Sequence, residues 1–186
     1  MGKKISVDSA TLMNKVFELI EARNIFDIQY QKLSIIIHRQ SYIHSIIKFK
    51  NGMIKFVAHD TTMKIPIFNT LYSNKIHYLE TKDIKTENLN KLTFDKINFK
   101  LFPINKILDN LPEKPTLFET VLVAANDKFV DLYLKKKITF IDFHRILIKF
   151  INLPLFKRYK KKVPKKINDI IKLSEYVRLK IDNMYI

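Results

Sequence analysis

The sequence contains no cysteine and no tryptophan, and only two of its 186 residues are glycine. Because cysteine is absent, a disulfide framework, thiolate catalysis and a cysteine-ligated zinc site are all excluded. Two glycines are too few for the glycine-rich strand–turn–helix fingerprint that binds a dinucleotide. A transmembrane helix needs roughly 20 consecutive apolar residues, and no apolar run in the sequence approaches that length.

The first residues lack the pattern of a secretory signal. The basic start Met1–Lys4 is followed neither by an apolar stretch nor by a small-residue cleavage site, so we expect a cytoplasmic protein. Apolar residues make up 47% of the chain and charged residues 28%, which favours a packed core over global disorder. The length suits one domain, or one domain with a small helical appendage.

Arginine is scarce, although the net charge of the chain is +16. Mutational bias toward AT-rich codons can supply much of the lysine, because isoleucine, asparagine and phenylalanine are abundant too. Arginine is the preferred residue for bidentate contacts to phosphates and bases, so we do not expect a nucleic-acid partner. The five arginines among 34 basic residues are Arg23, Arg39, Arg145, Arg158 and Arg178.

The densest basic segment is KRYKKKVPKK, residues 157–166. Its simplest interpretation is a solvated charged loop between helices. The alternative is a dedicated polyanion site, which would make the chain a basic, non-enzymatic module that binds nucleic acid or a membrane surface.

The front half of the chain predicts a mixture of helices and strands. Asn51-Gly52 between two apolar runs is a strong hairpin signal, and Ser9 stands where a helix N-cap is expected after an extended stretch at 6–8. The expected elements are a helix at 10–22, a buried strand at 34–38, strands at 42–49 and 53–58, and a helix at 65–72.

Residues 73–98 are polar and weakly periodic, and we interpret them as a connecting arm. Helical spacing returns after them, with Thr139 as a cap and Pro164 in a first turn. The expected helices cover 102–110, 116–135, 139–151 and 164–184.

These elements predict an α+β fold in which a mixed sheet with flanking helices is followed by a C-terminal helical bundle. The expected domains are a catalytic and dimerisation portion at 1–79, a connecting arm at 80–101 and a helical domain at 102–186.

The segment around Ser9 carries the clearest candidate site. On a helix that begins there, Asn14 and Glu18 lie on one face and Lys15 lies beside Asn14. The positive end of a helix attracts anions, so Ser9, Asn14 and Lys15 are suited to hold a phosphate and Glu18 a divalent cation. The plain alternative is a simple cap with surface residues behind it, and one carboxylate is too few for a metal site.

Residues 1–22, MGKKISVDSATLMNKVFELIEA, closely resemble the substrate-binding segment of 1-deoxy-D-xylulose 5-phosphate reductoisomerase. Residues 37–45, IHRQSYIHS, resemble that family's His-Pro-Gln-Ser-x-x-His-Ser stretch, although Arg39 replaces the proline. Later landmarks follow in the same order at 63–67, 92–94, 102–103 and 123–127, with Val123 in place of an asparagine and Thr61-Thr62 in place of Pro-Asp.

The family resembled here is an oxidoreductase of non-mevalonate isoprenoid biosynthesis. It isomerises and reduces 1-deoxy-D-xylulose 5-phosphate to 2-C-methyl-D-erythritol 4-phosphate with NADPH and a divalent cation, Mg²⁺ or Mn²⁺. The resemblance implies that Ser9, Asn14 and Lys15 bind the substrate phosphate. It also implies that Glu18 is a catalytic metal ligand that meets the substrate oxygens. Gly2 would lie against NADPH, and Met1 would belong to a mobile flap.

Family members are about twice as long, because a dinucleotide-binding domain precedes this segment. The resemblance therefore implies the C-terminal portion of the enzyme, with the remaining metal ligands upstream of Met1. We expect this chain to be inactive alone and to need an N-terminal half as a partner, such as one encoded separately. The hairpin at 42–58 is expected to form a homodimer sheet, and a folded remnant without activity is a further alternative.

Overall fold

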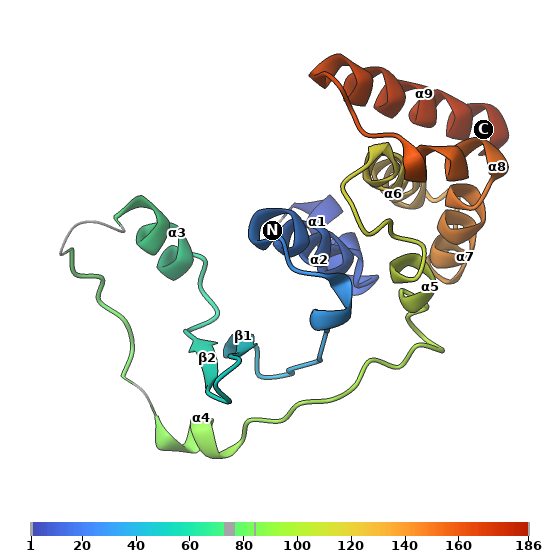
Figure 1. Cartoon of the computed structure of the whole chain (residues 1–186). Coiled ribbons are helices and arrows are strands. Elements are labelled where there is room, and N and C mark those ends of the chain that lie inside the picture. Colours follow the sequence, from blue (N-terminus) through green and yellow to red (C-terminus); the bar gives the residue numbers. More distant parts are fainter. Residues whose placement is uncertain (1, 73–76, 84, 186) are drawn as a thin grey trace. The chain divides into compact units, whose positions relative to one another are not determined.

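The computed structural model describes residues 2–72, 77–83 and 85–185. The predicted place of Met1 in a flap thus lies outside the described residues. The chain divides into two compact units (Figure 1), one formed by residues 1–35 with 98–186 and the other by residues 36–97. The predicted domains at 1–79, 80–101 and 102–186 stay a prediction.

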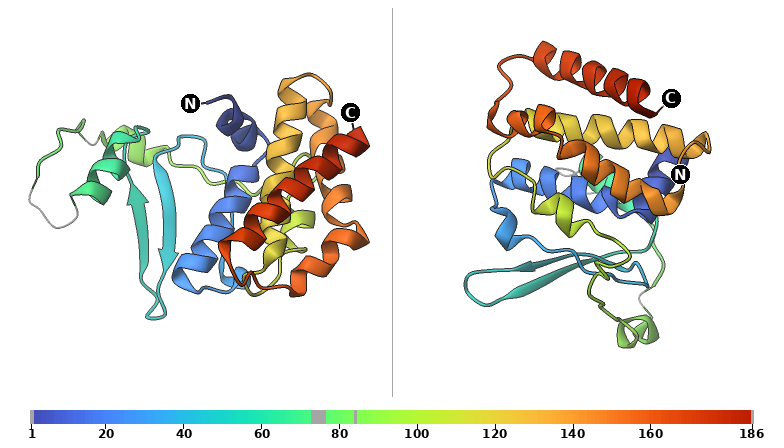
Figure 2. Two further views of the ribbon diagram at one scale, coloured as in Figure 1. Left: turned by 90° about the horizontal axis from the view of Figure 1, so that it is seen from above. Right: turned by 90° about the vertical axis from the view of Figure 1, so that its right-hand side faces the viewer.

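The first unit is helical and is built around α6, Leu117–Leu134. Helix α6 contacts α1 on one side and α9 on another, and it also packs against α7; Figure 2 shows it between the N-terminal helices and α9. The other elements are α1 (Lys3–Ala10), α2 (Met13–Phe26), α5 (Asn105–Leu108), α7 (Phe140–Ile151), α8 (Pro154–Lys157) and α9 (Ile167–Tyr185), with 3-10 turns at Tyr30–Lys32 and Arg158–Lys161.

Capping side chains set where the long helices begin. Thr116 and Glu119 form a capping box at the start of α6, and the Thr139 hydroxyl accepts a hydrogen bond from the Asp142 N–H, 3.2 Å away, at the start of α7. The predicted helices at 116–135 and 139–151 are therefore confirmed. Helix α9 begins at Ile167 rather than in the region of Pro164, because the Asp169 carboxylate accepts from the N–H groups just before the helix.

Helices α7 and α9 each bury one face, whereas the central helix α6 is buried around most of its circumference. Helices α6, α7 and α9 turn apolar side chains toward each other, and phenylalanines provide much of the buried volume. The largest fully buried side chains include Phe118, Phe129, Phe143, Phe150, Phe156 and Met13. The sequence predicts a core formed by Phe118, Phe129, Phe140, Phe143 and Phe150. Four of these are fully buried, but Phe140 is 40% exposed, so the prediction was wrong for that residue.

The N-terminal segment differs from the sequence prediction. Residues 6–8 are helical rather than extended, and Ser9 lies in the last turn of α1 instead of capping a helix. The chain turns at Leu12, whose φ of 58° is left-handed, and α2 then begins at Met13. The prediction was wrong because a leucine carries no sequence signal for a left-handed turn, a conformation that favours glycine or asparagine.

The second unit contains a two-stranded antiparallel sheet, β1 (Ile43–Lys48) paired with β2 (Ile54–Ala58). Gly52 has a φ of 88°, which explains why glycine follows Asn51 in the hairpin turn. The hairpin is confirmed, and a helix follows at α3 (Lys64–Leu71), with a short α4 at Thr86–Asn90.

The α+β class with a helical C-terminal part is confirmed. The described sheet, however, is two antiparallel strands and not a mixed sheet. Residues 34–38 form no strand, since the segment makes only a bridge between Ile37 and Asp95. A short apolar run is compatible with a strand, but it forms one only where a partner strand lies beside it.

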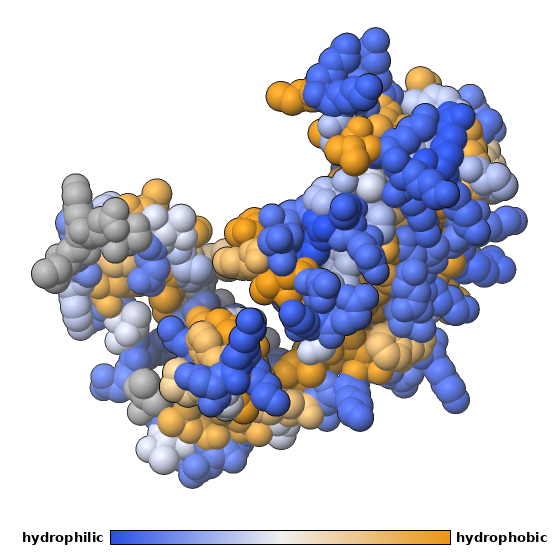
Figure 3. All heavy atoms as spheres, viewed as in Figure 1, coloured by the Kyte–Doolittle hydropathy of each residue, from blue (hydrophilic) through white to orange (hydrophobic). Residues whose placement is uncertain are grey.

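None of the described side chains between residues 36 and 97 is buried. Apolar side chains on both strands and on α3 are exposed, and Figure 3 shows apolar surface over the hairpin. They include Ile46, Ile47, Ile54, Phe56, Met63, Ile67 and Leu71. In the part of the chain that the structure describes, no helix combines the length and apolar character needed to cross a membrane.

Candidate functional site

The predicted site residues lie on both sides of the bend between α1 and α2. Ser9 is in the last turn of α1, Asn14 and Lys15 are in the first turn of α2, and Glu18 follows one turn later. The α2 N-terminus at Leu12 has no side-chain cap. Its first-turn N–H groups and its positive dipole end therefore still form an environment suited to an anion, although Ser9 reaches it from another helix.

Lys15 and Glu18 contact each other directly. Lys15 Nζ lies 2.9 Å from Glu18 Oε1 and 2.8 Å from Oε2. Both side chains are accessible, with exposed fractions of 42% and 55%. An exposed pair of this kind is held weakly, so either partner can exchange for a ligand.

Asn14 has a buried side-chain oxygen, Oδ1, that has no hydrogen-bond partner. The Nδ2 of the same side chain is a hydrogen-bond donor. Buried polar atoms are rarely left unpaired, and such atoms often occur at functional sites. Among the described residues, the hydroxyl of Ser9 forms no hydrogen bond, and no hydrogen bond joins Ser9 to Asn14 or Lys15.

A buried polar contact fixes α1 beside Ser9. Asp8 is 5% exposed, and its Oδ1 accepts a hydrogen bond from Nδ2 of Asn126 on α6 at 2.8 Å. Its other oxygen lies 3.2 Å from Nζ of Lys4, one turn earlier. The backbone of Ser9 is thus anchored to the central helix of the unit.

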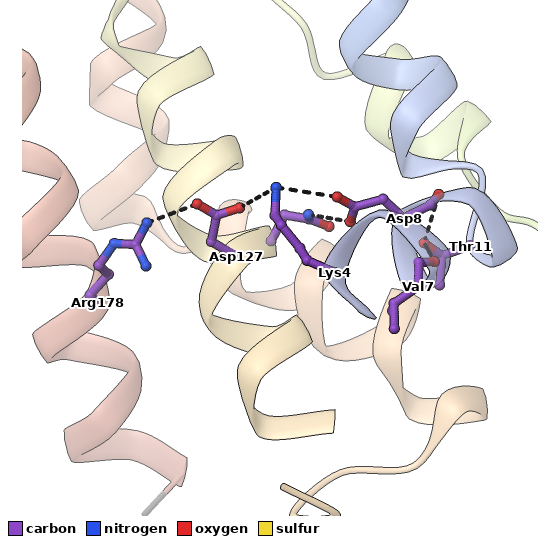
Figure 4. A network of polar contacts seen from close by, with 7 residues as sticks. Lys4, Val7, Asp8, Thr11, Asp127 and Arg178 are labelled. Atoms are coloured by element: carbon purple, nitrogen blue, oxygen red, sulfur yellow. Dashed lines mark hydrogen bonds and ion pairs between the residues drawn. The ribbon is translucent and has the colours of Figure 1, made fainter. Parts of the chain in front are cut away.

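Lys4 adds a second contact to α6 and links the network to one further helix, α9 (Figure 4). Its Nζ lies 2.8 Å from Oδ1 of Asp127 on α6, and the other oxygen of Asp127 accepts from Arg178 on α9 at 2.8 Å. Burial acts to lower the pKa of Lys4, but hydrogen bonds and charge from Asp127 and Asp8 outweigh it and raise that pKa. Lys4 therefore stays charged and holds α1 against α6.

Asn126 and Asp127 belong to the family landmark at 123–127, but the sequence predicted no role for them. The structure shows that they support the segment that carries Ser9. Their signal was available in the sequence, because an Asn-Asp pair that directly follows the apolar run at 121–125 needs polar partners if it is buried.

Gly2 is the N-cap residue of α1, with φ −68° and ψ 155°. Any residue adopts this conformation, and a Cβ added there would meet nothing within 4 Å. The described part of the chain therefore imposes no need for glycine at this position.

Among the described residues, no group of three or more His, Cys, Asp or Glu side chains is arranged to hold a metal ion. Glu18 is the carboxylate that faces the candidate site, and a single carboxylate supplies only part of a divalent-cation site.

Two family models match the chain. One, described as the DXP reductoisomerase C-terminal domain, matches residues 60–180. The other, described as the 1-deoxy-D-xylulose 5-phosphate reductoisomerase C-terminal domain, matches residues 1–26. The chain belongs to the 1-deoxy-D-xylulose 5-phosphate reductoisomerase family. The resemblance inferred from residues 1–22 and the later landmarks is confirmed.

Curated reductoisomerases align along nearly the whole chain. The enzyme of Pelagibacter ubique (strain HTCC1062) is 50% identical over 184 residues, which cover 99% of this chain and 47% of that relative. The enzyme of Clostridium perfringens (strain 13 / Type A) is 35% identical over 186 residues, which cover 100% of this chain and 47% of that relative. The chain thus spans about half the length of these curated relatives.

Solved reductoisomerases share the fold. The enzyme from Zymomonas mobilis in complex with NADPH matches with a TM-score of 0.83 and 30% identity, over 98% of this chain and 47% of that one. A reductoisomerase structure with fosmidomycin and magnesium matches with a TM-score of 0.89 and 26% identity, over 100% of this chain and 47% of that one.

Proposed function

We propose that this chain is the C-terminal part of an enzyme that converts 1-deoxy-D-xylulose 5-phosphate to 2-C-methyl-D-erythritol 4-phosphate. The reaction uses NADPH and Mg²⁺ or Mn²⁺ in non-mevalonate isoprenoid biosynthesis. The observation that carries the proposal is the bend between α1 and α2, where Ser9, Asn14, Lys15 and Glu18 coincide with the family match over residues 1–26.

The bend binds the phosphate of the substrate. Lys15 contributes a point charge, Asn14 Nδ2 an amide donor and Ser9 a hydroxyl donor. The α2 N-terminus, which has no side-chain cap, adds a favourable dipole. Together these groups fix one end of the sugar phosphate and orient the rest of it toward Glu18.

Glu18 is one ligand of a divalent cation, and acidic residues outside this chain complete the set. When bound, the cation polarises the oxygens of the substrate during rearrangement and reduction. Phosphate draws Lys15 away from Glu18 and leaves the carboxylate available. Gly2 lies against NADPH, whose approach explains a glycine that the chain itself does not require.

The chain alone does not catalyse the reaction, because it has one candidate carboxylate and no dinucleotide-binding fingerprint. An N-terminal half, joined to it or made separately, supplies the remaining groups. The predicted cytoplasmic location of the assembly stays a prediction.

Complementation tests this proposal. The purified chain is mixed with substrate, NADPH and Mg²⁺, with or without the N-terminal half of the Pelagibacter ubique relative. We expect NADPH oxidation only when both halves are present. Lys15→Ala should raise the KM for the sugar phosphate, while Lys172→Ala, which changes an exposed lysine on α9, should not. Turnover by the chain alone, or a stable two-part complex without activity, would contradict the proposal.

Dimerisation through the hairpin at 42–58 is part of the same proposal. The strands expose apolar side chains, and a two-stranded sheet leaves an outer edge on each strand. Phe56→Lys on β2 should shift the assembly from dimer to monomer in sedimentation velocity. Ile141→Lys changes an apolar side chain that is 89% exposed on α7, so it is the matched control and should leave the dimer intact.

A further inference from the structure

The bend between α1 and α2 depends on an unfavourable backbone conformation. Leu12 has a φ of 58°, in the left-handed region that a residue with a large side chain rarely adopts. Such a conformation persists only where surrounding contacts hold it, and it is often found at functional sites. The bend sets where Ser9 lies relative to Asn14 and Lys15.

Thr11, the residue before Leu12, is fully buried and bonded on several sides. Its hydroxyl donates to the Val7 carbonyl at 2.8 Å, and its N–H donates to the same carbonyl at 2.9 Å. These bonds join Thr11 to the last turn of α1 and therefore stabilise the end of that helix. They do not determine the direction in which the chain leaves toward α2.

His144 provides the contact from outside these two helices. It lies on α7 and is 5% exposed, and its Nε2 is 2.8 Å from the Thr11 carbonyl oxygen. Because a carbonyl oxygen only accepts, Nε2 carries the proton and donates. Burial lowers the pKa of His144, which keeps the ring neutral near neutral pH, and the bond to Thr11 acts in the opposite direction.

We propose that His144 is a positioning residue: its hydrogen bond to the Thr11 carbonyl holds the left-handed turn at Leu12 and so sets the spacing of the phosphate-binding groups. This inference rests on the proposed function of Ser9, Asn14 and Lys15. The carbonyl of Thr11 belongs to the peptide unit that joins it to Leu12, so the bond restrains the rotation that shapes the turn. The helical C-terminal region thereby fixes the geometry of a site to which it contributes no ligand-binding side chain.

Three variants of the full chain test the inference. His144→Gln keeps an N–H donor, His144→Phe fills a similar volume without a donor, and Phe150→Leu is a control on the same helix. Phe150 packs against Phe129 and Phe156, so its change weakens the core away from the bend. His144→Leu, which also lacks a donor, replaces His144→Phe if that variant does not fold.

The probes are inorganic phosphate and glycerol 3-phosphate, followed by NMR titration together with the backbone ¹³C shifts of Leu12. We expect His144→Phe to weaken phosphate binding roughly 5- to 10-fold, as loss of one buried hydrogen bond allows, and to move the Leu12 shifts. His144→Gln should stay within about 3-fold of the original affinity. Phe150→Leu should lower the unfolding midpoint and leave both readouts unchanged.

The outcomes separate the two proposals. Unchanged Leu12 shifts and affinity in His144→Phe would overturn the positioning role alone, and so would an equal loss of affinity in Phe150→Leu. If the original chain binds neither phosphate probe, the proposed function fails, and the positioning role for a phosphate site fails with it.

Discussion

Lys15 and Glu18 neutralise each other, with Nζ of the lysine 2.8 Å from Oε2 of the glutamate. In the proposed function these two charges serve different ligands, an anion and a cation. Either ligand must therefore break the Lys15–Glu18 ion pair when it binds alone. When both ligands bind, the cost of breaking the ion pair is incurred only once. Phosphate and cation should consequently bind with positive coupling.

Glu18→Gln should have opposite effects on binding and on catalysis. Without the carboxylate Lys15 is free, so the chain alone should bind inorganic phosphate up to about 5-fold more tightly, in keeping with an exposed ion pair of at most about 1 kcal/mol. In the complemented enzyme the same change should abolish metal-dependent NADPH oxidation. Phosphate titration and a steady-state assay measure the two effects. Weaker phosphate binding in Glu18→Gln would show that the ion pair does not compete with the anion.

Asn126→Leu should destabilise the helical unit by about 1.5–3 kcal/mol, because it removes a hydrogen bond to a buried carboxylate. Asp8 is 5% exposed and would keep only Lys4 as a side-chain partner. Urea denaturation measures the change. Lys135→Ala, at the C-cap of the same helix, breaks a solvent-exposed ion pair with Asp131 and should cost less than about 1 kcal/mol. Similar costs for the two variants would contradict a supporting role for Asn126.

His144 should make the free energy of unfolding fall as the pH is lowered below 6.5. Burial lowers the pKa of the folded ring from its ordinary value of 6.5, so between the lowered pKa and 6.5 the unfolded chain binds more protons. Stability therefore rises with pH through that window and its contribution is complete above it. His144→Gln should flatten the slope in urea titrations across the window. If the substitution leaves the pH dependence of the free energy of unfolding unchanged, that dependence comes from a titratable group other than His144.

Glu119 should produce the opposite slope at lower pH. Burial raises its pKa above the ordinary value of 4.5, although hydrogen bonds from its own backbone and from Thr116 act against the shift. Between 4.5 and the raised pKa the folded chain binds more protons, so stability falls as the pH rises through that window. Glu119→Gln preserves an acceptor for the capping box and should remove this slope. Thermal unfolding across the acidic range measures it, with Glu175→Gln, an exposed change on α9, as the control.

Helices with capping signals were predictable from sequence, and the bend was not. Thr116 and Thr139 stand directly before apolar periodic runs, and α6 and α7 begin where these caps place them. Ser9 has the same appearance, but its helix had already begun at Lys3 and ends at the next residue. A cap signal shows that a helix can start at a residue, and it does not show that an earlier helix is absent.

The identities of the site residues came from a family motif, while their surroundings came only from the structure. Spacing alone placed Asn14 and Glu18 on one helix face, which the structure agrees with. It did not reveal that Lys15 pairs with Glu18 or that Asn126, 118 residues away from Asp8, holds the segment in place. Nor did it reveal the contact of His144 with Thr11, since contacts across 133 residues leave no local pattern.

Residues 36–97 carry apolar side chains on a hairpin and a helix, yet none of their described side chains is buried. The hydrophobic effect therefore contributes little to ordering this segment within the chain itself. In the proposed dimer, the surface of the second copy covers the strands and offsets the conformational entropy lost on ordering them. If the proposed dimer forms, the equilibrium constant of assembly is linked to that of hairpin ordering, so protein concentration sets how much of the hairpin is ordered.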